Sequence, residues 1–166
     1  TYGVDQSQSP VFLEKKARNL NRVSKERVRI TAEDLCFFCE EVSINDIFNC
    51  FSENSLIMEF ASETCRKSLQ PLLLVDYFRA PYVSDFDMNF RVTFDHKIRS
   101  KASSNLFGND DNFRSVLSGF SILEVKFNRR LPAWFHKLVL AYDLERLSIS
   151  KFVCGIKVTD LAVDLS

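Results

Sequence analysis

The residues of this chain that could do chemistry are lysines, arginines and glutamates that recur at every second position of short segments. In Ser121–Phe127, SILEVKF, an extended chain places Glu124 and Lys126 on one face with Ile122, and apolar residues on the other. The charged faces of four other segments carry Phe12, Glu14 and Lys16; Lys25, Arg27 and Arg29; Tyr77 and Arg79; and Arg91, Thr93 and Asp95. One such face usually points to water. Five brought together would line a basic cavity that suits a polyanion and a divalent metal.

The elements that must position these residues are five strands, over residues 11–16, 23–30, 72–79, 90–95 and 121–127. The link Ala17–Arg22 is short and contains two asparagines, so we expect the first two strands to form a β-hairpin. The second strand carries three cations on one face, which repel one another unless solvent or a bound anion screens them. For this strand, a solvated outer face and an anion-binding face both remain open.

The segment between the second and third strands has helical spacing. Residues 31–70 contain no glycine or proline, and apolar residues recur at intervals of three and four, which predicts two or three helices ended by Pro71. We expect these helices to cover one side of the sheet, with their aromatic residues in the core.

The last third of the chain predicts a loop and a helix, followed by a segment around Lys151 that is either a phosphate-binding site or a capped loop end. Residues 97–119 are rich in serine, asparagine and aspartate, which predicts a mobile loop that acts as a lid or a linker. A helix is predicted from Leu131, with Pro132 in its first turn and an apolar stripe that continues through Phe135, Leu138 and Tyr142. Lys151 then stands among small hydroxyl residues before a closing glycine, where it could donate to phosphate oxygens.

Composition limits the class of protein. A chain of 166 residues with 46% hydrophobic content and sixteen phenylalanines is long enough for one domain with a core. The net charge is zero, which gives no overall attraction to nucleic acid or to an anionic membrane. No apolar run reaches the roughly 18 residues of a membrane span, and no signal peptide opens the chain. We therefore expect a cytoplasmic protein without membrane insertion.

The five cysteines, an odd number, favour a reducing compartment over a disulfide scaffold. Cys36 and Cys39 form a CxxC motif, which occurs in redox-active cysteine pairs and as half of some zinc sites. Thr31 followed by acidic residues is typical of a helix N-terminus, and that helix would place both thiols on its apolar side. We expect this pair to be structural.

Six motifs, in this order and at these intervals, resemble the VTC domain: FLEKK, SKERVRI, VDYFRAPY, FRVTFD, LEVKFNRRLPAWF and SISKFVCG. The resemblance extends from Thr1 to about Ile156. The VTC domain is the polyphosphate polymerase domain of the vacuolar transporter chaperone complex and of free-standing bacterial relatives, in the CYTH-like, or triphosphate tunnel metalloenzyme, superfamily. The resemblance implies an α+β fold over residues 1–166, in which an antiparallel β tunnel lined by lysine and arginine has helices packed outside.

The resemblance also implies roles for individual residues. Five basic residues match family positions that contact phosphate and would carry catalysis: Lys16, Lys25, Arg79, Arg91 and Lys151. Glu124 matches the metal-binding glutamate, so Mg²⁺ or Mn²⁺ is the implied cofactor, with Glu14 as a second candidate ligand. Three further residues are expected to bind phosphate: Arg27, Lys126 and Ser150.

The implied activity is that of a metal-dependent phosphotransferase, a polyphosphate polymerase that transfers the γ-phosphate of a nucleoside triphosphate to a growing polyphosphate chain. A triphosphate hydrolase (tripolyphosphatase) on the same scaffold and a non-catalytic polyphosphate-binding module remain alternatives. The expected partners are nucleoside triphosphate and polyphosphate, without nucleic acid. Family members have tunnel strands before the TYG at which this chain begins, so we expect those N-terminal strands to be missing, and Ser148 stands where some members have a lysine.

Overall fold

The computed structural model describes residues 9–19, 22–31, 33–39, 44–85, 87, 89–107 and 111–161. Contacts divide the chain into two compact units, one formed by Thr1–Leu72 with Ser103–Asn109 and the other by Leu73–Ala102 with Asp110–Ser166. Each unit is described by itself. The expectation of a single VTC-like domain over residues 1–166 stays a prediction.

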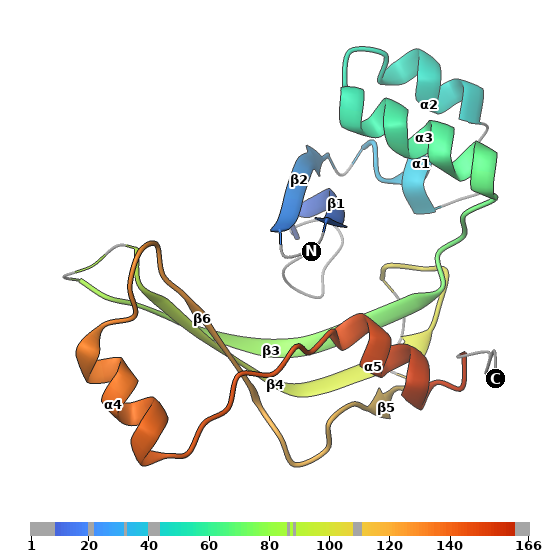
Figure 1. Cartoon of the computed structure of the whole chain (residues 1–166). Coiled ribbons are helices and arrows are strands. Elements are labelled where there is room, and N and C mark those ends of the chain that lie inside the picture. The colour runs from blue at the N-terminus through green and yellow to red at the C-terminus, as the bar shows by residue number, and fades with distance from the viewer. Residues whose placement is uncertain are drawn as a thin grey trace. The chain divides into compact units, whose positions relative to one another are not determined.

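The first unit contains a two-stranded antiparallel hairpin of β1 (Val11–Asn19) and β2 (Arg22–Ile30) (Figure 1). Val11 lies opposite Ile30, and the register continues to Asn19 opposite Arg22. The predicted hairpin is confirmed, and its strands extend over most of the predicted link. Because residues opposite each other in an antiparallel pair share a face, one side of this hairpin carries Val11, Leu13, Val28 and Ile30, and the other carries most of the charged residues.

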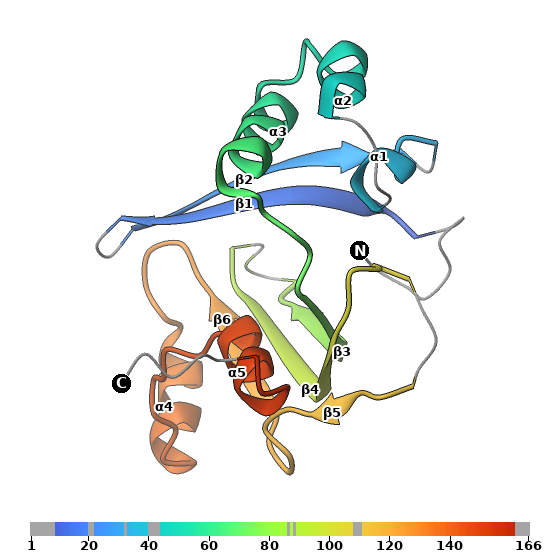
Figure 2. The same ribbon diagram turned by 90° about the vertical axis from the view of Figure 1, so that its right-hand side faces the viewer.

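Helices cover the apolar side of the hairpin. They are α1 (Cys36–Cys39), α2 (Ile44–Cys50) and α3 (Ser55–Lys67), which confirms the helices predicted for this segment. Figure 2 shows α3 lying across the hairpin. The buried core of the unit joins both strands to the helices and consists of Val11, Ile30, Leu35, Ile47, Ile57 and Ala61. The side chains of the CxxC cysteines, Cys36 and Cys39, lie outside the described residues.

The third helix, α3, ends before Pro71, the residue at which the sequence predicted its end. Asn54 caps its N-terminus, since the Asn54 side chain accepts the N–H of Ile57 at 3.2 Å. Ser68 adopts a left-handed conformation with φ of 50°, and its N–H bonds to the carbonyl of Thr64. The helix therefore ends through a left-handed cap, three residues before Pro71.

The second unit is built on an antiparallel sheet in which β4 (Arg91–Ala102) pairs with three strands. On one side lies β3 (Leu73–Val83). On the other side, β6 (Ile122–Lys126) pairs with the first half of β4, and the short β5 (Arg114–Ser115) pairs with the second half. The strands predicted around VDYFRAPY, FRVTFD and LEVKF are confirmed. Phe127 lies just beyond the end of β6 and is exposed.

The predicted mobile loop over residues 97–119 is wrong in its first part, because β4 continues through Ala102. The cause is a β-bulge. Between two aligned pairs, β3 has one residue, Tyr77, where β4 has Lys97 and Ile98, and Lys97 takes a φ of 50°. The extra residue shifts the phase of the alternation, so that Ile98 and Ser100 are buried as Asp95 is. A search for a strict period of two therefore stops at the bulge.

One helix covers part of each face of this sheet. On the apolar face, α4 (Ala133–Ala141) packs through Phe135 against Val92 and Leu123. Its predicted stripe is partly wrong, since Leu138 and Tyr142 are exposed and Val139 packs instead. Spacing by four residues keeps 131, 135 and 139 over the sheet, and Pro132 directly precedes the helix.

On the charged face lies α5 (Lys151–Val158) (Figures 1 and 2). The alternative of a capped loop end at this place is therefore wrong. Gly155 lies in the middle of α5 and is buried. A Cβ at this position would come within 2.7 Å of Leu73 Cδ2 and 3.2 Å of Ser100 Cβ, so the site has no room for a larger side chain. The glycine permits close approach of the helix to the sheet, which brings the first turn of α5 over β4.

The sheets and helices confirm a mixed α+β fold with antiparallel pairing. Within the ranges that the structure describes, the strands form no closed barrel, so the expected tunnel is not confirmed. None of the helices described is both long and apolar enough to cross a membrane.

Candidate functional site

The charged face of the second unit collects residues from three strands. The register places Arg79 of β3 opposite Asp95 of β4. It also places Glu124 of β6 opposite Thr93, and Lys126 opposite Arg91. Because opposite residues of an antiparallel pair share a face, the pairing brings together side chains that are up to 47 positions apart in sequence.

Asp95 is the centre of this face. Its side chain is fully buried and accepts two hydrogen bonds from Arg79, from Nε to Oδ1 at 2.6 Å and from Nη2 to Oδ2 at 2.7 Å. Lys151, the first residue of α5, approaches the same carboxylate, with its Nζ 2.7 Å from Oδ2. One buried carboxylate thus holds two cations from different parts of the chain in fixed positions.

Tyr77 completes this cluster from the bulged part of β3. The Arg79 guanidinium carbon lies 5.3 Å from the centre of the Tyr77 ring, and Lys151 Nζ lies 4.8 Å from it. Both distances are within the range of cation–π attraction. The ring therefore limits the directions in which the two cations can move.

The cations keep hydrogen-bond donors for a ligand. Arg79 uses Nε and Nη2 on Asp95, and Nη2 also reaches Glu124 Oε2 at 3.3 Å. A guanidinium has five N–H donors, and no hydrogen bond to a described residue uses the two on Nη1. Lys151 has three donors, of which Asp95 takes one. Both side chains are about one fifth to one quarter exposed, so these donors are within reach of solvent and of a bound anion.

The electrostatics of this cluster follow from its pairing. Burial raises the pKa of the Asp95 carboxyl, but the hydrogen bonds from Arg79 and Lys151 outweigh burial and hold this pKa below its usual range. The hydrogen bond to Asp95 raises the pKa of Arg79 above its ordinary value, against the lowering effect of burial. Asp95 and Arg79 are therefore both charged at neutral pH.

Positive charge is in excess on this face. Glu124 contacts Arg79 through one carboxylate oxygen and Lys126 Nζ through the other, at 3.2 Å. Lys126 lies directly opposite Arg91, and both side chains are exposed. Like charges facing each other on a sheet are unfavourable unless an anion or solvent screens them. Four cations against two carboxylates give a face that favours an anionic ligand.

The first unit carries a second charged face. Glu14 lies opposite Arg27 and accepts from Lys16 Nζ at 3.0 Å and from Lys25 Nζ at 2.6 Å. The Arg27 guanidinium carbon lies 4.9 Å from the centre of the Phe12 ring. Burial raises the pKa of Glu14, but its hydrogen bonds to Lys25 and Lys16 dominate and lower it. The register confirms that the predicted charged faces of β1 and β2 lie on one side of the hairpin, where two lysines bind the carboxylate of Glu14.

Ser150 has a structural role in addition to its predicted one. It is the N-cap of α5, and its Oγ accepts the N–H of Val153 at 3.3 Å. The cap fixes where the helix begins, and therefore places Lys151 at its first position over Asp95.

The structure separates the predicted site residues into two groups. Within the second unit it brings together Arg79, Arg91, Glu124, Lys126 and Lys151, with Ser150 at the start of the same helix. Within the first unit it brings together Glu14, Lys16, Lys25 and Arg27. Arg79 pairs with Asp95 and Glu124, and not with Asp76 of its own strand. Asp76 instead accepts from Arg99 Nε at 2.7 Å.

The donor set distinguishes the two predicted metal ligands. Both oxygens of Glu14 are bound by ammonium groups at 3.0 Å or less, so a metal there would have to displace lysines. The contacts of Glu124 are longer, and Thr93, directly opposite it, has a buried hydroxyl without a hydrogen-bond partner among the described residues. No group of three acidic, histidine or cysteine side chains that could hold a metal occurs in the described part of the chain. Glu124 therefore fits Mg²⁺ or Mn²⁺ that takes its other ligands from phosphate and water.

Sequence reasoning placed Asp95 and Tyr77 on charged faces but gave neither a role. A signal was present in FRVTFD, where Asp95 shares a predicted face with Arg91. These two residues are four positions apart along an extended strand, which is too far for their side chains to form a close ion pair. The aspartate therefore needs a cation from another strand, but the choice of Arg79 depends on the register of β3 against β4. The contribution of Lys151 needed the position of α5.

Comparison with known proteins identifies the family of this chain. No curated protein matches the chain. The family model described as the VTC domain matches residues 1–159 of the 166 in the sequence. The chain therefore belongs to the VTC domain family, a family that is associated with polyphosphate enzymes.

Proposed function

We propose that this chain is a polyphosphate polymerase, which transfers the γ-phosphate of a nucleoside triphosphate to the end of a growing polyphosphate chain. The observation that carries the proposal is the arrangement of Arg79 and Lys151 around the buried carboxylate of Asp95. Membership of the VTC family supports polyphosphate as the class of substrate.

The Asp95 cluster suits a chain of phosphates better than a single one. Arg79 and Lys151 donate to one phosphate group through N–H groups that Asp95 leaves available, in the charge-assisted way that arginine and lysine bind phosphate oxygens. Arg91 and Lys126 lie further along the same face of β4 and β6 and bind the neighbouring group. In the first unit, Lys16, Lys25 and Arg27 are proposed to bind phosphate as well.

Phosphoryl transfer needs positioning and charge neutralisation more than covalent chemistry. Fixed cations hold the attacking oxygen of the acceptor phosphate in line with the γ-phosphorus, while they neutralise negative charge on the non-bridging oxygens. Asp95 keeps the cations at their positions before the substrate arrives. The bond from the γ-phosphorus to the nucleotide oxygen breaks as the bond to the acceptor oxygen forms, and the nucleoside diphosphate leaves.

Glu124 is proposed to hold Mg²⁺ or Mn²⁺, which would supply additional positive charge next to the phosphate oxygens. The carboxylate stands between Arg79 and Lys126, so Glu124 also orients these two cations when no metal is bound. Substituting Glu124 with glutamine keeps the size of the side chain while it removes the charge that a metal needs.

The test is incubation of the full chain with ATP and either Mg²⁺ or Mn²⁺, followed by separation of the phosphate products on a gel. We expect chains of polyphosphate, and their loss in Glu124→Gln. Lys137→Gln, on the exposed side of α4, is the control and is expected to behave as the wild type.

Other products would reassign the function. Orthophosphate or pyrophosphate without chains would identify a triphosphate hydrolase, in which water replaces the phosphate acceptor in the same cation cluster. Tight binding of polyphosphate, with no turnover of ATP in the presence of either metal, would identify a non-catalytic binding module.

A further inference from the structure

The apolar face of the sheet in the second unit is only partly covered by α4. The register of β3 and β4 places Phe78, Tyr82 and Phe94 on this face, beyond the buried residues that pack against α4. These three residues, the aromatic strip, are 58%, 60% and 40% exposed. The ring centres of Tyr82 and Phe94 lie 5.9 Å apart, so the exposed rings are in contact along the sheet. Exposed apolar patches of this kind mark interaction surfaces.

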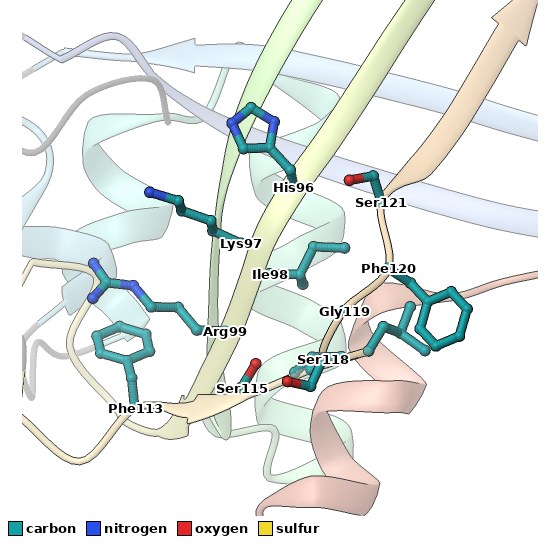
Figure 3. A pocket seen from close by; sticks show the side chains of 12 residues that line it. His96, Lys97, Ile98, Arg99, Phe113, Ser115, Ser118, Gly119, Phe120 and Ser121 are labelled. Atoms are coloured by element: carbon teal, nitrogen blue, oxygen red, sulfur yellow. The ribbon is translucent and has the colours of Figure 1, made fainter.

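Polar side chains border the aromatic strip at the end of the strands away from α4. His96 stacks on Phe78 with 5.8 Å between the ring centres, and Lys97 Nζ lies 5.5 Å from the centre of the Phe78 ring. Figure 3 shows His96, Lys97 and Arg99 following one another along β4. An apolar centre with a polar border is the usual anatomy of a protein interface.

The helix α4 is apolar on more than one side. Only two of its nine residues, AWFHKLVLA, are polar. Phe135 packs against the sheet, whereas Leu140 lies about 140° further around the helix and is 67% exposed. Trp134 and Leu138 are exposed as well. Helices that are hydrophobic on all sides are normally buried, so the outer side of α4 is expected to have a partner.

The two features complement each other. In the part of the chain that the structure describes, the aromatic strip has no helix over it, and the outer side of α4 has no sheet against it. The contacts of a two-fold dimer are reciprocal, so α4 of each copy can cover the aromatic strip of the other. We propose that this face is the interface of a homodimer, in which the two α4 helices lie side by side between the two sheets. An unrelated partner that covered only the strip would leave the outer side of α4 exposed.

The exposed area is sufficient for such a dimer. With about 200 Å² per aromatic side chain, the exposed parts of the aromatic strip and Trp134 amount to roughly 400 Å² on each copy. A standard interface buries about 800 Å² per partner, so these rings provide about half of that area. Leu138 and Leu140 of α4 and the polar border add to it.

The dimer leaves the Asp95 cluster accessible. Phe94 precedes Asp95 in β4, and neighbouring residues of a strand point to opposite faces of the sheet. The proposed interface and the Asp95 cluster therefore lie on opposite faces, and the homodimer does not depend on polymerase activity.

The experiment is sedimentation velocity of the full chain at concentrations from about 1 to 100 µM, a range that includes micromolar dissociation constants. We expect a species of twice the mass of one chain, whose proportion rises with concentration. It should persist in about 0.5 M sodium chloride, where charge interactions are screened, because the centre of the interface is apolar. Dissociation in this salt would contradict an apolar interface.

Two variants test the reciprocal contact from its two sides. Phe78→Ser changes the aromatic strip and Leu140→Gln changes the outer side of α4, and each alone should weaken dimerisation at least about ten-fold. Phe152→Ser is the matched control, because Phe152 is a 49% exposed phenylalanine of α5, on the other face of the sheet, and should dimerise as the wild type does.

Circular dichroism verifies that each variant is folded, and if one of the two does not fold, the other decides. The proposal is overturned if the wild type stays a monomer over the whole range, or if a folded Phe78→Ser or Leu140→Gln dimerises as well as the wild type. Loss of the dimer in Phe152→Ser would overturn it too, since the interface would then include the face of α5.

Discussion

Replacement of Asp95 with asparagine removes the charge that holds two cations in place while it keeps the shape of the side chain. Breaking a buried ion pair by neutralising one partner costs about 3–5 kcal/mol, because the remaining charges lose their compensation. Arg79 and Lys151 are 24% and 21% exposed, so water can hydrate them in part. We therefore expect the lower end of that range, a loss of about 3 kcal/mol in the free energy of unfolding.

The assay is urea unfolding of the wild type and the variant, followed by far-UV circular dichroism. With a denaturant dependence of about 2 kcal/mol per M, the midpoint should fall by about 1.5 M. Asp76→Asn is the matched control, because Asp76 also pairs with an arginine across β3 and β4 but its side chain is 40% exposed. A surface pair of this kind contributes at most about 1 kcal/mol. If the two variants lose the same stability, Asp95 is not the fixed centre of this face.

Further predictions concern pH, packing and salt. Because the pKa of Asp95 is lowered in the folded state, its charge stabilises the fold at pH values above the unfolded-state pKa of about 4, and this contribution is lost as the pH falls towards the folded-state pKa. The free energy of unfolding should therefore fall less steeply with acid in Asp95→Asn than in the wild type. Gly155→Ala should lower stability by about 1–3 kcal/mol, because the new methyl group would lie 2.7 Å from Leu73 Cδ2 and 3.2 Å from Ser100 Cβ. A thermal melt identical to that of the wild type would contradict this packing. Tripolyphosphate binding should weaken steeply with salt, and Arg91→Gln should reduce the slope of log affinity against log salt by about one. A flat salt response would contradict binding by several cations.

Much of the local structure could be predicted from sequence because the alternation of charged and apolar residues is strict where strands are regular. In β1 and β2, the alternation predicted which residues share the charged face, and the observed register places Glu14 among its cations. The same reasoning gave the shared face of β4 and β6. Sequence could not give the neighbours of Arg79, since the choice between Asp76, Asp85 and Asp95 depends on the register of β3 against β4.

Two failures have a common physical origin, which is backbone geometry that the side-chain pattern does not display. The bulge at Lys97 shifts the alternation by one residue, and the rest of β4 was therefore taken for loop. Gly155 was expected to end a segment, as glycine often does after a helix. In α5 it instead allows close contact between the helix and the sheet. Only the structure shows this reason, because only the structure places Ser100 next to Gly155.

The measurement that tests the central claim most directly is calorimetric titration of tripolyphosphate into the wild type, Lys151→Gln and the control Lys137→Gln. If the Asp95 cluster holds phosphate, loss of one charged hydrogen bond of about 1.5–3 kcal/mol should weaken binding ten-fold or more in Lys151→Gln. Lys137→Gln, which removes a lysine of α4 on the other face of the sheet, should bind as the wild type does. Equal affinity of all three proteins would contradict the assignment of Lys151 and its neighbours as phosphate ligands.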